Sequence, residues 1–287
     1  MKIKIAEYKR ILAAAMAVVM ITFTACGAAD TQTDAAKEET AAEEIENPLT
    51  GSQHPYYYNE EHLERYEAYA RENPDLTEDE VIWHVEADID KDVYEDMTEI
   101  PDVLLDMDYE QLLVSKHFVL PEDYEPADLV TLKDGYKATE ATVKAFREME
   151  KAANADGVEL DICSAYRSYS HQTELYNSYV ASNGRESADT FSARPGSSEH
   201  ETGRAIDMMG PSGILEDYEN TESCAWIHEN AYKYGFILRY GKDIEDVTGY
   251  MYESWHITYI GKEAAEIMHD ENIEAFEEYW VKYVKYQ

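Results

Sequence analysis

The segment at residues 198–207, SEHETGRAID, constrains this chain more than any other part of it. It places His200 seven residues before Asp207, and it comes just after Pro195 and Gly196. Proline and glycine argue against one continuous helix, so we predict that residues 205–209 form a short strand entered through a turn. A histidine and a carboxylate spaced in this way are candidate metal ligands.

A second cluster, ESWHITY at residues 253–259, lies further along the chain. His256 would join His200 and Asp207 in a set of two nitrogens and one oxygen, which suits zinc and leaves a fourth position open to water. Manganese and cobalt accept the same ligand types. Glu253 lies close to His256 in the sequence and could take a proton from that water. These residues predict a hydrolase with one zinc ion per chain.

The alternation of side chains along a strand gives a reason for these ligands to meet. Ala205 and Asp207 should share one face of their strand, with Ile206 on the other. The same rule puts His256 and Thr258 on one face of the second strand. If the two strands are neighbours, Asp207 and His256 converge on one side of a sheet while apolar residues pack the core on the other.

Three ordered motifs resemble the VanY-type D-alanyl-D-alanine carboxypeptidases and their LD-carboxypeptidase relatives, over about residues 112–267. They are Ser-x-His-x-x-Gly-x-Ala-x-Asp at 198–207, Glu-x-x-His at 253–256, and SAYRSY at 164–169 followed by Gln172. Together with few strands spread between helices, the resemblance implies an α+β fold of the hedgehog/DD-peptidase-like type. In it, a small, mostly antiparallel sheet carries the zinc site and helices flank the sheet.

The resemblance also assigns roles to seven residues: zinc ligands His200, Asp207 and His256; general base Glu253; substrate contacts Arg167, Gln172 and Ser198. The planar fork of Arg167 suits the free carboxylate at a substrate's C-terminus, or a developing oxyanion. A structural salt bridge is the alternative for Arg167 in so acidic a chain, and a fourth ligand or a surface acid is the alternative for Glu253.

The N-terminus reads as an export signal. Basic residues precede an apolar run at residues 11–23, which is too short to span a bilayer comfortably. The run ends in Thr24-Ala25-Cys26, and a small residue before cysteine resembles a bacterial lipoprotein signal. We therefore expect residues 1–26 to be a signal peptide, Cys26 to be lipidated, and the protein to be anchored at the outer face of the bacterial cell membrane. Ordinary secretion is the alternative.

The rest of the chain divides by composition. Residues 27–52 are acidic, offer little to bury and are predicted to be a disordered tether. Residues 53–110 are predicted to be a helical extension, either an accessory module or, as we favour, a packing extension, and residues 111–287 the catalytic domain. Helices are predicted at 60–72, from Thr77 onward, and at 137–155, 170–181, 222–234, 262–269 and 273–286, with strands at 160–164, 205–209, 236–240 and 255–259.

Net charge limits the partners that the chain can bind, and its cysteines raise the question of a disulfide. The chain has 61 acidic and 24 basic side chains and a formal charge of −37, which would repel nucleic acid and anionic membrane surfaces. Cys163 and Cys224 could pair in an exported protein, but their predicted places in a strand and a helix favour two buried thiols. We expect a monomer.

These observations predict a zinc-dependent D-alanyl-D-alanine carboxypeptidase that removes the terminal D-alanine of peptidoglycan stem peptides. An LD-carboxypeptidase or a peptidoglycan endopeptidase of the same fold stays open, because pocket shape decides between them. A non-catalytic module that binds cell-wall peptide is the competing class, and the presence of Glu253 argues against it.

Overall fold

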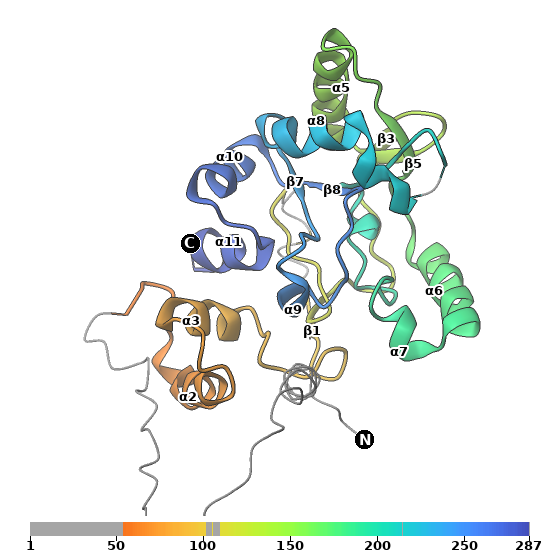
Figure 1. Ribbon diagram of the computed structural model, residues 1–287. Helices are drawn as coiled ribbons and strands as arrows, with labels where there is room; N and C mark the ends of the chain where they lie inside the picture. The colour runs from red at the N-terminus through yellow and green to blue at the C-terminus, as the bar shows by residue number, and fades with distance from the viewer. Residues whose placement is uncertain (1–53, 102–104, 106–109, 214, 287) are drawn as a thin grey trace, which may run out of the picture. The chain divides into compact units, whose positions relative to one another are not determined.

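The computed structural model describes residues 54–101, 105, 110–213 and 215–286 (Figure 1). The expected signal peptide, with Cys26, and the expected tether lie outside these residues. None of the helices described is both long and apolar enough to cross a membrane.

A four-stranded antiparallel sheet lies at the centre of the fold, in the order β5-β6-β8-β7. Its strands are β5 (Asp161–Ser164), β6 (Ala205–Met209), β7 (Phe236–Leu238) and β8 (His256–Tyr259). This sheet confirms the predicted fold class, a small antiparallel sheet among helices. Three of the four strands are one or two residues shorter than predicted.

One face of the sheet packs against the main core. Ile206, Met208 and Ile257 are fully buried there, together with Phe146 and Met149 of α5 (Glu140–Ala155). Because side chains alternate along a strand, the residues between them point to the opposite face, and that face holds the candidate site.

The start of α5 differs from the prediction. Residues 137–139 are not helical but form β4 (Lys137–Thr139), which pairs antiparallel with β3 (Leu129–Thr131). Thr139 then caps α5, since its side chain accepts a hydrogen bond from Thr142 N. Pairing with β3 and this cap set the helix start, and the apolar spacing inside the helix does not reveal either.

The remaining helices surround the sheet (Figure 1). They are α6 (Tyr169–Asn183), α7 (Arg185–Ala188), η2 (Glu199–Thr202), η3 (Leu215–Asn220), α8 (Glu222–Asn230), η4 (Ala231–Tyr234), α9 (Glu245–Thr248), α10 (Lys262–Glu271) and α11 (Phe276–Tyr283). The predicted helix at 222–234 is therefore an α-helix followed by a 3-10 turn that ends at Gly235, and α11 is shorter than the predicted 273–286.

The N-terminal extension contains η1 (Glu60–His62), α2 (Leu63–Glu72) and α3 (Glu78–Glu86). Thr77 and Glu80 form the capping box at the start of α3. β1 (Thr98–Glu99) pairs parallel with β2 (Phe118–Val119). Helix α3 lies beside α11, and Val81 and Ile82 share one buried cluster with Ala275 and Val281 (Figure 1). The extension thus packs against the C-terminal end of the chain.

Candidate metal centre and substrate cavity

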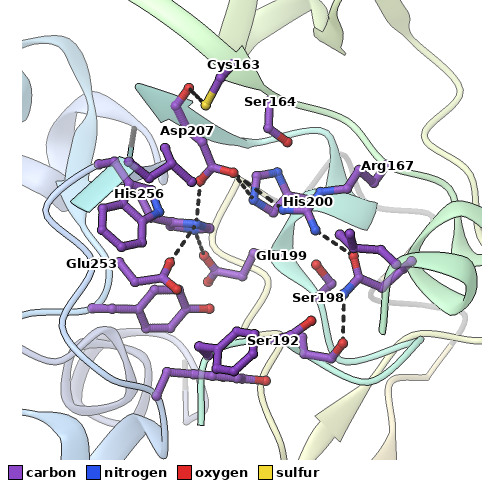
Figure 2. A pocket seen from close by; sticks show the side chains of 18 of the residues that line it. Cys163, Ser164, Arg167, Ser192, Ser198, Glu199, His200, Asp207, Glu253 and His256 are labelled. Carbon is purple, nitrogen blue, oxygen red and sulfur yellow. Dashed lines mark hydrogen bonds and ion pairs between the residues drawn. The ribbon is translucent and has the colours of Figure 1, made fainter. Parts of the chain in front are cut away.

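The two predicted clusters meet on one face of the sheet. Asp207 on β6 and His256 on β8 are direct cross-strand partners. His200 comes from η2, the 3-10 turn that precedes β6, and Gly203 ends this turn in the left-handed region at φ 68°. Figure 2 shows Asp207 between the two imidazole rings.

In the part of the chain that the structure describes, one group of three His, Cys, Asp or Glu side chains could hold a metal ion. It consists of His200, Asp207 and His256, whose ligand atoms all lie within 4.8 Å of one another. The Nε2 atom of His200 is 3.1 Å from Asp207 Oδ2, and Nδ1 of His256 is 3.1 Å from Asp207 Oδ1. Asp207 Oδ1 is buried without a hydrogen-bond partner. A buried carboxylate oxygen that faces a ring nitrogen but makes no hydrogen bond needs an explanation, and a bound cation provides one.

The other nitrogen of each ring has a partner of its own. His200 Nδ1 lies 2.7 Å from the carbonyl oxygen of Ala165, and His256 Nε2 lies 3.3 Å from Glu199 Oε2. Both partners are acceptors, so the hydrogen of each ring belongs on that outer nitrogen. The inner nitrogens are then free to bind a metal beside Asp207, and this set of donors fits a divalent ion such as zinc.

Burial and neighbouring charges shift the pKa values of the three candidate ligands in different directions. Burial would raise the pKa of Asp207, but the two histidines hold it well below its usual range. Burial and the charge of Arg167 lower the pKa of His200 to about 4. Burial would also lower the pKa of His256, but the neighbouring carboxylates of Asp207 and Glu199 raise it to about 9.

Glu253 lies just before β8, next to the candidate ligands. Its Oε2 atom is 3.7 Å from Nδ1 of His256, and the residue is only 9% exposed. Burial, with the negative charge of Asp207, raises the pKa of Glu253 to about 8. A carboxyl group with a pKa near neutrality and a place in the cavity is suited to taking up and releasing a proton.

Arg167 reaches the same cavity from the segment after β5. Its Nη1 donates to Gln172 Oε1 at 2.7 Å, and its Nη2 lies 3.5 Å from Asp207 Oδ2. The Gln172 amide in turn donates to the carbonyl oxygen of Ala193 at 2.7 Å. Gln172 is therefore placed to orient Arg167, while the buried Nε of Arg167 has no partner.

The cavity has a volume of about 630 Å³. Arg167, Gln172, Ser198, Glu253 and the three candidate ligands all line it, and an apolar wall is formed by Leu175, Tyr179, Phe191, Met209 and Trp255. Its size, and the combination of many polar groups with an apolar wall, suit a small ligand or the end of a peptide.

Cys163 and Cys224, the two cysteines among the described residues, are free thiols, as the sequence favoured. Cys224 is buried, whereas Cys163 is half-buried and lines the cavity. Burial raises the pKa of Cys163 to about 12, so the thiol stays protonated and is a poor nucleophile.

Sequence reasoning missed two charged residues behind the metal centre. Glu199 precedes His200 directly, and Arg239 follows β7 inside the apolar run FILRY. Both are almost fully buried and form an ion pair. For Arg239, the available signal was a single charge inside an otherwise apolar run.

Comparison with known proteins agrees with this geometry. The VanY family, described as D-alanyl-D-alanine carboxypeptidase, matches residues 136–262. A protein of Bacillus subtilis named putative carboxypeptidase YodJ is 40% identical over 60% of this chain and 67% of its own length.

Two solved structures are similar in fold. The LdcB LD-carboxypeptidase superposes with a TM-score of 0.59 at 36% identity, over 67% of this chain and 94% of that one. A vancomycin resistance D,D-pentapeptidase VanY variant in complex with Zn(II) has a TM-score of 0.53 at 31% identity, over 59% of this chain and 98% of that one.

Fold, cavity and candidate metal centre therefore define a peptide hydrolase of the carboxypeptidase class. Within that class, the chain belongs to the VanY family of D-alanyl-D-alanine carboxypeptidases.

Proposed function

We propose that this protein is a zinc-dependent carboxypeptidase that removes the terminal D-alanine of peptidoglycan stem peptides. The observation that carries the proposal is one cavity that holds three convergent candidate metal ligands, a buried carboxyl group and a guanidinium group. A VanY relative of similar fold binds Zn(II), which supports zinc as the metal.

The residues of the chain divide the work of the reaction. Arg167 binds the free carboxylate of the substrate and so holds the last peptide bond beside the metal ligands. Glu253 takes the proton of the attacking water and passes it to the amine that leaves. When bound, zinc supplies a Lewis acid that polarises the scissile carbonyl and lowers the pKa of water to about 7. The apolar wall limits the access of other water to the site.

The first test is product analysis. The purified protein, without the expected signal peptide, should release free D-alanine from pentapeptide muropeptides when loaded with zinc. Release of none, with cleavage of internal cross-bridges instead, would replace this proposal by an endopeptidase.

An LD-carboxypeptidase is the second candidate, and the likeness to LdcB favours it, with 94% of that chain covered. Such an enzyme would shorten tetrapeptides to tripeptides and leave pentapeptides intact. Mass spectrometry of parallel digests of tetra- and pentapeptide substrates separates the two specificities.

Glu253 can be tested by Glu253→Gln. Because the amide cannot accept the proton, kcat should fall about 100- to 10,000-fold, while zinc content stays unchanged. Glu263→Gln, an exposed change on α10, is the control for the same chemical substitution and should keep full activity. An unchanged kcat in Glu253→Gln would remove this residue from the mechanism and leave the ligand set untouched.

We also propose that lipid attached to Cys26 holds the protein at the outer face of the cell membrane, where its substrate lies. The basic residues, the short apolar run and the cysteine of the N-terminal sequence support this. Radiolabelled palmitate should be incorporated by cells that make the wild-type protein and not by cells that make Cys26→Ala. Equal labelling of both would leave ordinary secretion.

A further inference from the structure

A buried carboxylate, Glu199, lies behind the metal centre. It is 2% exposed, and its Oε2 atom lies 3.3 Å from His256 Nε2. The same oxygen accepts the hydroxyl proton of Thr258 at 2.5 Å. Its other oxygen accepts from Arg239 Nε at 2.7 Å. Glu199 thus connects the outer nitrogen of His256, a candidate ligand, to the buried guanidinium of Arg239.

The guanidinium of Arg239 is also bound by the C-terminal helix α11. Arg239 is 1% exposed, and its two terminal nitrogens donate to the carboxylate of Glu277 on α11 at 3.0 and 2.5 Å. Glu277 is buried as well. One guanidinium therefore uses three of its donors on two carboxylates, in the bidentate geometry that makes such pairs strong.

These contacts determine which nitrogen of His256 carries its hydrogen. Nε2 faces Glu199 Oε2, which can only accept, and Thr258 Oγ1 at 3.3 Å. Since the Thr258 hydroxyl proton goes to Glu199, its oxygen can only accept from the ring. Both neighbours thus require a hydrogen on Nε2, which leaves the lone pair of Nδ1 directed toward Asp207.

We propose that Glu199 is a positioning residue of the metal centre, with Arg239 and Glu277 as its support. It holds His256 in the tautomer that can bind metal through Nδ1 and makes that nitrogen more basic. This inference rests on the proposed role of His256 as a metal ligand. It also gives α11 a part in the site, since Glu277 reaches His256 through Arg239 and Glu199.

The wild-type protein provides a first test that needs no variant. ¹⁵N NMR of the metal-free protein, at a pH where the ring of His256 is neutral, should find its hydrogen on Nε2. A hydrogen on Nδ1 would overturn the proposal.

Glu199→Gln tests whether the carboxylate of Glu199 sets the tautomer of His256. The amide oxygen must face Arg239 Nε, which turns the NH2 group toward Thr258 and His256. That group donates a hydrogen bond to Nε2 and so drives the ring hydrogen to Nδ1. Zinc affinity, measured by competition with a chelating dye, should fall about 10- to 100-fold, and the ¹⁵N shifts should report the reversed tautomer.

Two variants separate this effect from a general loss of structure. Thr258→Val removes one acceptor beside the His256 ring but keeps the carboxylate, so the tautomer should be unchanged and zinc affinity should fall less than in Glu199→Gln. Glu86→Gln removes another fully buried carboxylate, which contacts Lys285, Tyr286 and Tyr66 instead. It should lower stability and leave zinc affinity unchanged.

The outcomes distinguish this inference from the proposed function. Wild-type zinc affinity in Glu199→Gln, or a loss of the same size in Glu86→Gln, overturns the positioning role. Failure of the wild-type protein to hydrolyse muropeptides overturns the proposed function, while the tautomer and zinc measurements remain readable.

Discussion

At the scale of single residues, the contacts of Arg167 support its proposed role in binding the C-terminal carboxylate of the substrate. Gln172 fixes one side of its guanidinium, and Nη2 lies 3.5 Å from Asp207 Oδ2, which is too long for a strong ion pair. The buried Nε has no partner. The guanidinium therefore has donor capacity that these contacts do not use, which supports the proposed role in substrate binding over a purely structural salt bridge.

Arg167→Lys keeps the charge but loses the planar fork, so two parallel hydrogen bonds to a carboxylate become one. Hydrogen bonds to charged groups contribute about 1.5–3 kcal/mol, and kcat/KM should accordingly fall about 10- to 100-fold. Steady-state kinetics on a pentapeptide measure this. Arg147→Lys, an exposed change on α5, is the control; equal kcat/KM in both variants would exclude carboxylate binding by Arg167.

At the scale of elements, the turn between η2 and β6 decides whether His200 and Asp207 can face each other. Gly203 adopts φ 68°, and a Cβ there would lie 3.0 Å from Leu129 Cδ2 and 3.2 Å from Thr139 Cγ2. Its carbonyl oxygen also accepts from Thr139 N at 2.9 Å. The turn needs a residue that tolerates both the left-handed backbone and this close approach.

Gly203→Ala should therefore lower the free energy of unfolding for two reasons: the left-handed backbone conformation and the close contacts of the added Cβ. Gly157→Ala is a matched control, because Gly157 has φ 83° but no atom within 4 Å of its Cβ position. The conformational cost alone is about 1–2 kcal/mol of unfolding free energy. Urea denaturation should show a larger loss in Gly203→Ala than in Gly157→Ala. Equal losses would mean that Leu129 and Thr139 move aside freely.

At the scale of the whole molecule, one buried carboxylate links the N-terminal extension to the end of the chain. Glu86 on α3 is fully buried and contacts His62, Tyr66, Lys285 and Tyr286. Burial would raise the pKa of Glu86, but its partners, Lys285 first among them, lower it to about 2. The extension is thus tied to the catalytic part by charge as well as by apolar packing.

This lowered pKa makes stability depend on pH in a defined window. The folded pKa lies below the ordinary value, so the contribution of Glu86 is complete above about pH 4.5 and is lost as pH falls toward 2. The loss is about 3 kcal/mol, because a tenfold change in proton affinity corresponds to about 1.4 kcal/mol. Urea unfolding at several pH values should show a smaller acid loss in Glu86→Gln than in wild type. Parallel curves of unfolding free energy against pH for the two proteins would contradict this role of Glu86.

Much of the candidate site could be predicted because its motifs are local. Strand alternation placed Asp207 and His256 on one face, and the breakers before Ser198 predicted the turn into β6. The predicted start of α5 was wrong. Helical periodicity allows residues 137–139 in the helix, but in the structure they pair with β3 as strand β4.

The sequence alone determined the candidate ligands through their motifs, and the small antiparallel sheet through local periodicity and turn chemistry. Only the tertiary structure decided that Glu199, Arg239 and Glu277 lie together behind His256. The physical reason is that contacts between distant segments depend on how helices pack on the sheet. A periodic pattern tells which face of an element is buried, but not which buried charge on another element it will meet.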